Sequence, residues 1–303
     1  MIDPTEERRQ RLLGIALMCG AVAFFACLDS TGKYLNGYMN TLEVVWARYL
    51  SGFAFAVILS NPIKRPALMK TSRPLLQIAR SGLLLSATIL NLYALRWLQL
   101  DQTTSILFGA PFLVALLSGP LLDEWVGWRR FGAILVGFAG VLVVTRPGLG
   151  GLGMPALFSV GGMCCYALYI ITTRILARTD SSQTTLFYSN LLGAVAMSVI
   201  VPFIWTPPDG WFIVVLMVMT GAFGSVGHYM LIAAHRLTAP VVLAPFMYLQ
   251  LVWAIILSYF VFADLPNRWT WLGAAIVVSS GLYLLHRERR VGKAPAAAGL
   301  AAE

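Results

Sequence analysis

Apolar runs, each close to the length of a membrane-spanning helix, follow one another along almost the whole sequence. Charged residues make up only 12% of the 303 residues, about half the share found in soluble domains, so lipid must cover part of the apolar surface. We therefore expect an all-α polytopic membrane protein. Its ten predicted spans are Leu12–Lys33, Thr41–Leu59, Leu76–Leu98, Thr103–Leu122, Arg130–Thr145, Met154–Leu176, Thr184–Trp205, Trp211–Ala234, Ala239–Phe262 and Trp269–His286.

The basic residues fall in short clusters between these runs, and this pattern accounts for the net charge of +9 without a nucleic-acid partner. If the N-terminus lies in the cytoplasm, most Lys and Arg residues fall on the inner side of the membrane. The outer side then holds only Lys33, Arg96, Arg146 and Arg268. Because inner loops carry the excess of positive charge, we expect both termini in the cytoplasm and the chain in the cell inner membrane.

The two halves of the sequence resemble each other at an offset of about 141 residues. Phe131-Gly132-Ala133 falls on Leu272-Gly273-Ala274, Gly140 falls on Gly281, and Lys33 falls on Arg174. Each half holds an odd number of spans, so the second half must enter the membrane from the opposite side. The expected domains are two inverted five-helix repeats at 12–146 and 153–286, followed by a cytoplasmic tail at 287–303 that we expect to be disordered.

Inverted repeats favour transport, because two half-structures can exchange conformations around a site on the axis between them. A non-transporting receptor or assembly subunit is the alternative of another class, and it has no comparable need for an inverted duplication. The glycine pairs Gly132 with Gly140 and Gly273 with Gly281 fit close helix packing, either within one subunit or across a homodimer.

Several motifs occur in a characteristic order along the chain. They are Asp29-Ser-Thr-Gly-Lys33, Trp46-Ala-Arg48-Tyr49, Ala110-Pro111-Phe112, Ala244-Pro245-Phe246 and Phe262-Ala263-Asp264-Leu265-Pro266. With them the chain resembles the EamA-type carriers of the drug/metabolite transporter superfamily, from about Leu12 to His286. The resemblance implies ten spans around a central cavity. It also implies a cargo such as an amino acid or its derivative, riboflavin, S-adenosylmethionine or a metal-chelating metabolite.

The chain departs from this family after the fourth and ninth spans, where the family often has Gly-Glu. The positions here read Asp123-Glu124 and Ala263-Asp264, and we interpret them as loop features and not as site residues.

Charged groups inside the spans need a partner or a function, because hydrocarbon solvates them poorly. Asp29 and Lys33 are one helical turn apart near the outer end of the first span, and Arg48 lies about two turns into the second. They form either a structural pair, Asp29 with Lys33 or with Arg48, or an outer gate that orients the substrate. His228, in the eighth span, either packs as a hydrogen-bonded side chain or carries protons.

Amide and aromatic side chains gather nearer the middle of the spans. They are Asn91, Tyr166, Tyr248, Gln250 and Trp253. They either join helices through hydrogen bonds or line one pocket, in which a planar or amphipathic solute would stack. We assign substrate binding to this set, and gating or coupling to Asp29, Lys33, Arg48 and His228.

The sequence shows no His/Cys cluster with metal-ligand spacing, no nucleophile elbow and no glycine-rich phosphate loop. We therefore predict a secondary transporter, not an enzyme, that needs no cofactor or metal and whose partners are a small-molecule substrate and the lipid bilayer. The leading substrate prediction is an amino acid or an amino-acid-derived compound, moved by alternating access. Uptake of riboflavin or S-adenosylmethionine is the alternative.

Overall fold

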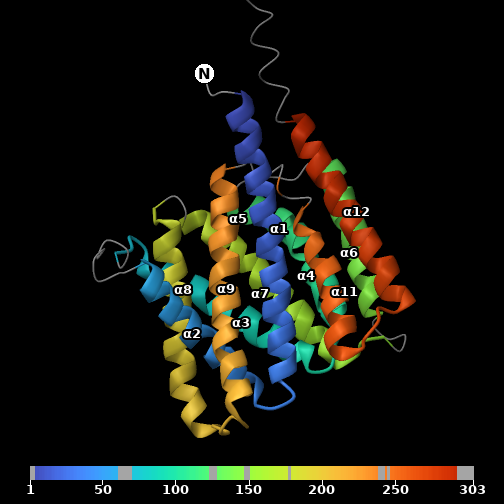
Figure 1. The fold of residues 1–303 in the computed structure, drawn as a ribbon. Coiled ribbons are helices and arrows are strands. Elements are labelled where there is room, and N and C mark those ends of the chain that lie inside the picture. The colour runs from blue at the N-terminus through green and yellow to red at the C-terminus, as the bar shows by residue number, and fades with distance from the viewer. Residues whose placement is uncertain are drawn as a thin grey trace, which may run out of the picture.

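The computed structural model describes residues 4–60, 70–122, 128–146, 151–176, 179–237, 243 and 246–291. Within these ranges every regular element is helical (Figure 1). The helices are α1 (Pro4–Leu35), α2 (Thr41–Ser60), α3 (Pro74–Leu95), α4 (Leu100–Leu107), α5 (Ala110–Leu122), α6 (Trp128–Thr145), α7 (Met154–Leu176), α8 (Ser182–Ile200), the 3-10 turn η2 (Val201–Phe203), α9 (Trp211–Leu237), α11 (Leu249–Phe262) and α12 (Arg268–Val291).

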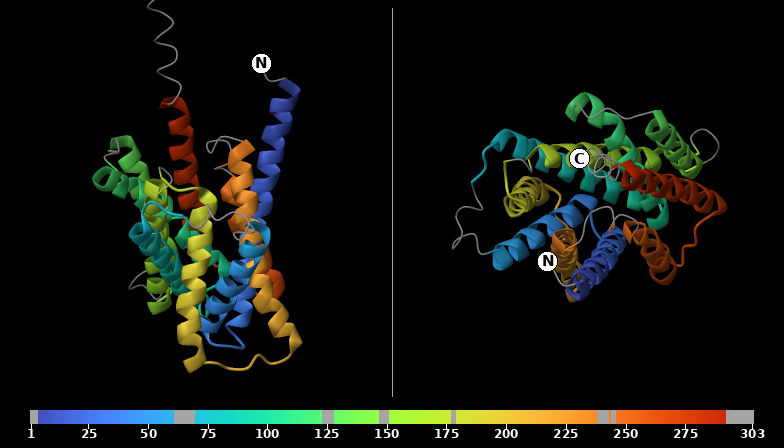
Figure 2. Two further views of the ribbon diagram at one scale, coloured as in Figure 1. Left: turned by 90° about the vertical axis from the view of Figure 1, so that its left-hand side faces the viewer. Right: turned by 90° about the horizontal axis from the view of Figure 1, so that it is seen from above.

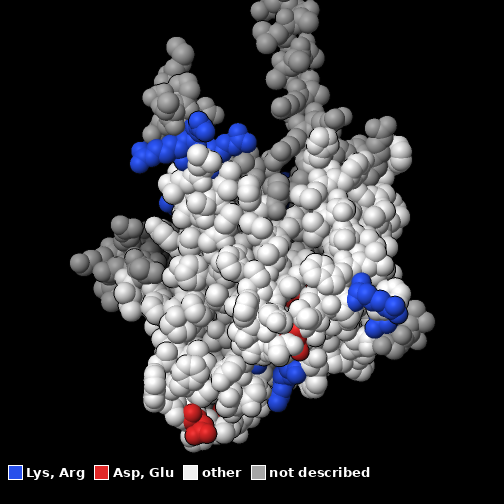
Figure 3. Space-filling model, turned by 45° about the vertical axis from the view of Figure 1, so that its right-hand side comes forward, with Lys and Arg blue, Asp and Glu red and all other residues white. Residues whose placement is uncertain are grey.

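The surface of this bundle is suited to lipid. Seven described segments are long and apolar enough to cross a membrane, one of which, Leu100–Leu117, combines α4 with most of α5. Phe131–Thr145 and Leu249–Phe262 are shorter apolar helices. Large apolar side chains stand outward, among them Phe203 at 86% and Trp128 at 78% exposure. Figure 3 shows charged side chains toward the two ends of the molecule and a broad uncharged band between them. Exposing such a large apolar band to water would be unfavourable, so the chain is an integral membrane protein.

Helices from the two halves of the sequence pack against each other in related pairs (Figure 2). α1 packs on α9 as α7 packs on α3, α2 packs on α9 as α8 packs on α3, and α1 packs on α11 as α7 packs on α5. In each of these comparisons, the helices of the second contact are the counterparts, in the other half of the sequence, of the helices of the first contact. This contact pattern is typical of a duplicated structure and supports the predicted repeat.

α7 runs antiparallel to α1. Just after α1, Asn36 donates a hydrogen bond from Nδ2 to the carbonyl oxygen of Leu92 at 2.7 Å, so α1 and α3 end side by side. Gly161, in the first half of α7, packs against Leu90 of α3. The start of α7 therefore lies near the end of α1, as an inverted second half requires. The start of α1 and the end of α12 share one end of the bundle, here called the terminal end; the other is the distal end (Figure 1).

Glycine allows the close approach of α6 and α12. A Cβ atom on Gly140 would lie 3.0 Å from the carbonyl oxygen of Gly273, and one on Gly273 would lie 2.6 Å from the carbonyl oxygen of Gly140. Ser280 adds a hydrogen bond from its hydroxyl to the carbonyl oxygen of Ala133 at 2.6 Å. Gly140 and Gly273 thus pack helices closely within one subunit, and Gly281 packs against the Tyr248 side chain. Gly132, the fourth of the predicted glycines, has open space where a Cβ atom would lie.

Two element boundaries differ from the prediction. The expected span Thr103–Leu122 is divided into α4 and α5 at Phe108–Gly109, because Pro111 has no amide hydrogen to continue the helical ladder from α4. The tail expected to be disordered from residue 287 instead begins as helix, since α12 continues to Val291 through residues of good helix propensity. Residues 292–303 lie outside the described part of the chain.

Candidate functional site

A cavity of about 250 Å³ lies among α1, α2, α3, α4, α7, α9 and α11, so both halves of the sequence line it. Its polar and aromatic lining residues include Asp29, Arg48, Thr88, Asn91, Ser159, Tyr166, Tyr169, His228 and Gln250. The cavity is somewhat smaller than the range of about 300–1,000 Å³ that is usual for ligand sites. Three residues of the predicted substrate site and three of the predicted gate thus face one space.

Asp29 and Arg48 bring opposite charges into this cavity without pairing. Both side chains are half-buried. The Asp29 carboxylate accepts one long hydrogen bond, from Asn91 Nδ2 at 3.4 Å, and the Arg48 guanidinium lies 5.8 Å from the ring of its neighbour Tyr49. The two charges interact electrostatically, but no hydrogen bond or ion pair joins them in the described structure. Most of their hydrogen-bonding capacity therefore remains available to a solute.

One wall of the cavity is aromatic. The rings of Tyr166 and Tyr169, three residues apart on α7, stack with centroids 5.7 Å apart and planes at 19°. Across from α7, the imidazole of His228 packs edge-on against Phe25, with centroids 5.0 Å apart. Aromatic faces of this kind bind planar rings by stacking and bind cations through the ring quadrupole.

Arg80, which lies near the start of the predicted span Leu76–Leu98, is found behind this wall. It is only 3% exposed, and its Nη2 donates a hydrogen bond to the Tyr169 hydroxyl at 2.8 Å. A signal for this position is present in the sequence. Arg80 precedes Ala87 and Asn91 on α3 by seven and eleven residues, and these intervals place all three on one helix face.

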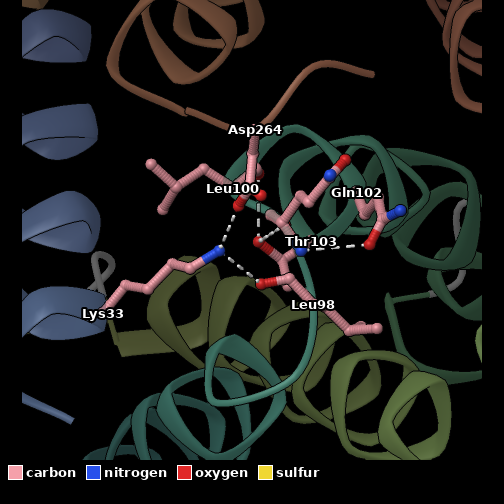
Figure 4. A network of polar contacts seen from close by, with 7 residues as sticks. Lys33, Leu98, Leu100, Gln102, Thr103 and Asp264 are labelled. Carbon is pink, nitrogen blue, oxygen red and sulfur yellow. Dashed lines mark hydrogen bonds and ion pairs between the residues drawn. The ribbon is translucent and has the colours of Figure 1, made fainter. Parts of the chain in front are cut away.

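Lys33 does not pair with Asp29, contrary to one of the predicted arrangements. Its Nζ lies 3.0 Å from Asp264 Oδ2 and donates to the carbonyl oxygen of Leu98 at 3.1 Å (Figure 4). The ammonium also lies 4.7 Å from the ring centroid of Phe262. These groups satisfy the lysine donors more fully than one carboxylate a turn away could. Asp264, which we interpreted as a loop feature, thus holds α1 to the segment after α11 at the distal end. Asp123-Glu124 lies outside the described residues.

The remaining predicted site residues, Tyr248 and Trp253, do not line the cavity. Trp253 is 40% exposed on the outer surface of α11. Tyr248 packs edge-on against Phe108, with ring centroids 5.1 Å apart, beside an apolar cluster that includes Ile106 and Val277. The structure therefore separates Gln250 from Trp253, although both lie on α11 at similar depth.

Larger hollows lie on the outside of the bundle. One of about 700 Å³ lies between α6 and α12, and another of about 640 Å³ lies between α2 and α9. Their walls include exposed apolar side chains such as Val136, Tyr283 and Ile58, so lipid chains would contact them in a membrane. Among the described residues, no group of three or more His, Cys, Asp and Glu side chains could hold a metal ion. The central cavity is therefore the candidate site.

An integral membrane bundle of two packed halves with a polar cavity between them defines a class, the membrane carriers with internal repeats. The sequence model of the EamA-like transporter family matches residues 12–146 and 153–285. The chain belongs to this family and is a transporter, not an enzyme.

The relatives are similar over nearly their whole length. An S-adenosylmethionine uptake transporter of Rickettsia felis is 27% identical over 280 residues, which cover 92% of this chain and 94% of the relative. A riboflavin transporter of Rhizobium johnstonii is 26% identical over 297 residues, covering 96% of each. A solved crystal structure shares the fold with a TM-score of 0.62 at 16% identity, and the match covers 94% of this chain and 99% of that one.

Proposed function

We propose that this chain carries S-adenosylmethionine, or a metabolite with the same combination of groups, across the cell inner membrane. The observation that carries the proposal is the presence of Asp29 and Arg48 in one cavity without pairing. S-adenosylmethionine has a cationic sulfonium and ammonium as well as an anionic carboxylate. Buried charges require partners, and a solute with both signs supplies one for each side chain.

The rest of the cavity matches the adenosine part of such a solute. The stacked rings of Tyr166 and Tyr169 offer a face for a planar base, and the amides of Asn91 and Gln250 offer hydrogen-bond donors and acceptors. Most free amino acids, which belong to the substrate class predicted first, have no planar ring to use this wall. The names of the Rickettsia relatives support the nucleoside-bearing substrate as well.

Riboflavin is the second candidate. Relatives from Rhizobium johnstonii and Vibrio cholerae, 26% and 23% identical, are riboflavin transporters. The isoalloxazine ring is planar and would also stack on the tyrosine wall. However, riboflavin is neutral, so it leaves Asp29 and Arg48 without counter-charges, and for this reason it ranks second.

The transport cycle follows from the repeat. In this proposal ten spans form two inverted repeats, at 12–146 and 153–286, that rock around the cavity, and both termini lie in the cytoplasm. The shared position of the start of α1 and the end of α12 supports an even number of crossings. The distal end is then the outer side, and the link between Lys33 and Asp264 closes the cavity there. Moving substrate inward requires this link to break once in each cycle.

Cellular uptake tests the proposal. Bacteria that express the chain receive radiolabelled S-adenosylmethionine or, in a separate arm, radiolabelled riboflavin, and cells with the empty vector give the background. We expect S-adenosylmethionine to accumulate above this background and unlabelled S-adenosylmethionine to compete. Accumulation of riboflavin alone would replace the first candidate with the second, and accumulation of neither would overturn the proposal.

A further inference from the structure

A buried arginine without an acidic partner lies directly behind the cavity wall. Arg80 is 3% exposed, and its guanidinium donates to Thr173 Oγ1 at 2.7 Å, to Ser189 Oγ at 2.7 Å and to the carbonyl oxygen of Thr185 at 3.2 Å. No carboxylate of the described chain pairs with it. Neutral oxygens alone therefore surround a positive charge, and removing such a charge from water is costly unless an anion approaches.

Arg80 also determines how the hydroxyl of Tyr169 can bond. Nη2 donates to the Tyr169 oxygen at 2.8 Å, and the guanidinium lies 4.4 Å from the centroid of the tyrosine ring. A guanidinium has no acceptor, so the tyrosine oxygen must accept and its own hydrogen must point elsewhere. Tyr169 lines the central cavity, and its hydroxyl hydrogen forms no hydrogen bond to another described residue. The hydroxyl is thus held as a donor for something in the cavity.

A small hollow of about 30 Å³ adjoins the cavity at this point. It shares Arg48, Tyr169 and His228 with the cavity wall. Its other polar lining residues are Tyr49, Ser189, Asn190 and Ser225, and Ser189 also accepts a hydrogen bond from Arg80. The hollow has room for about one or two water-sized groups, which is the size of the two oxygens of a carboxylate. Its described lining contains no acidic residue.

The charged side chains that act on the hollow are all positive. Arg48 lines it directly, and both Arg48 and Arg80 act electrostatically on His228. Asp29 lines only the larger cavity and does not line the hollow. The space therefore has a mixed region near Asp29 and a purely positive extension near Tyr169, and the extension favours an anion.

We infer that this hollow is the subsite for the carboxylate of the substrate, an assignment that rests on the proposed function. Arg48 and the Tyr169 hydroxyl contact the carboxylate, and Arg80 is a positioning residue that holds Tyr169 as a donor. The cationic group of the same molecule lies toward Asp29 and Asn91. A substrate analogue without the carboxylate leaves the donors of the hollow unsatisfied, and it is therefore bound more weakly.

Competition in proteoliposomes tests the assignment. Uptake of labelled S-adenosylmethionine is inhibited with unlabelled S-adenosylmethionine or with its decarboxylated analogue. For the wild type we expect the analogue to need a concentration at least about tenfold higher for half-inhibition, which is typical of one lost charge-assisted hydrogen bond.

Two variants locate this preference in the hollow. Tyr169→Phe keeps the ring and removes the hydroxyl, and we expect KM to rise several-fold, Vmax to change little and the preference for the carboxylate to shrink. Arg80→Lys keeps the charge but not the planar fork, and should reduce the preference in the same direction. Tyr93→Phe is the matched control, because Tyr93 packs against Phe158 away from the cavity, and its uptake should equal that of the wild type.

The outcomes separate this assignment from the proposed function. If both inhibitors are equally potent on the wild type, S-adenosylmethionine is still the substrate but the carboxylate subsite is overturned. If the preference is intact in both Tyr169→Phe and Arg80→Lys, the hollow is not its source. If the wild type transports riboflavin and not S-adenosylmethionine, both proposals fail, since riboflavin has no carboxylate.

Discussion

The central cavity and the cluster around Lys33 both contain charges of opposite sign, and the protein satisfies them differently. At the distal end, Lys33 lies 3.0 Å from Asp264 and also bonds a carbonyl oxygen, so a direct link joins α1 to the segment after α11. In the cavity, Asp29 accepts one hydrogen bond of 3.4 Å and makes no ion pair with Arg48. The first pair is a structural link, whereas the second leaves its bonding capacity to a solute. Two sets of oppositely charged side chains can thus have different functions, one closing the distal end and the other binding a solute.

The largest expected effect comes from removing a cavity charge. We expect Arg48→Gln to lower Vmax/KM for S-adenosylmethionine by about 10- to 100-fold, because hydrogen bonds to charged groups contribute about 1.5–3 kcal/mol. Asp29→Asn should act similarly through the cationic end. The measurement is uptake in proteoliposomes, with protein amount and melting temperature recorded for each variant. Wild-type kinetics in both would show that these charges do not contact the substrate.

The link at the distal end should affect stability more than substrate affinity. We expect Lys33→Met or Asp264→Asn alone to destabilise the protein, and the double variant to recover part of the loss. The coupling energy should be about 1–2 kcal/mol, because Asp264 is partly exposed and water screens the pair. Chemical unfolding of the two single variants and the double variant in detergent measures this coupling. Additive effects would mean that the two residues act independently.

Two neighbours on α11 provide a finer comparison. Gln250 lines the cavity, so Gln250→Ala should raise KM by about 3- to 10-fold, the usual range for one neutral hydrogen bond. Trp253 is 40% exposed on the outer surface, so Trp253→Ala should leave KM within about twofold of the wild-type value. The reverse order would place the site on the other face of α11. Both variants are tested in the same uptake assay.

The smallest expected effect concerns a carboxylate outside the spans. Burial raises the pKa of Asp180, but the hydrogen bonds from Thr71, from Gln77 at 2.8 Å and from the Ser72 amide at 3.2 Å together outweigh it, and the pKa falls below the ordinary 3.8. A carboxyl with a lowered pKa in the folded state stabilises above its unfolded pKa, and this contribution is lost as the pH falls through the folded value.

Asp180→Asn removes this contribution. The variant should therefore melt slightly below the wild type at pH 7, and the difference should shrink as the pH falls below the ordinary pKa of the carboxyl and through its lowered folded value. Uptake at pH 7 should be unchanged, because Asp180 is not in the cavity wall. Thermal unfolding followed from pH 7 to pH 3 measures the effect. A gap that widens on acidification would contradict the sign of the pKa shift.

The apolar spans were predictable because hydrocarbon requires about 20 apolar residues for each crossing. The shared position of Asp29, Arg48, Asn91 and His228 was partly predictable, since each polar group in a span needs protein or water around it. The partner of Lys33 was not, because Asp264 is 231 residues away in the sequence. Arg80 was not identified as a site residue, since a basic residue near a span end equally predicts topology. For Trp253, spacing on α11 does not reveal which face turns to lipid.

The most direct test of the account is a structure of the protein in a lipid nanodisc with S-adenosylmethionine bound. We predict that the solute occupies the central cavity, with its cationic groups beside Asp29 and its carboxylate beside Arg48 and Tyr169. We also predict that Asp29 and Arg48 remain unpaired with each other when the cavity is filled. A solute bound in the outer hollows, or a filled cavity in which Asp29 forms an ion pair with Arg48 and neither touches the solute, would contradict the account.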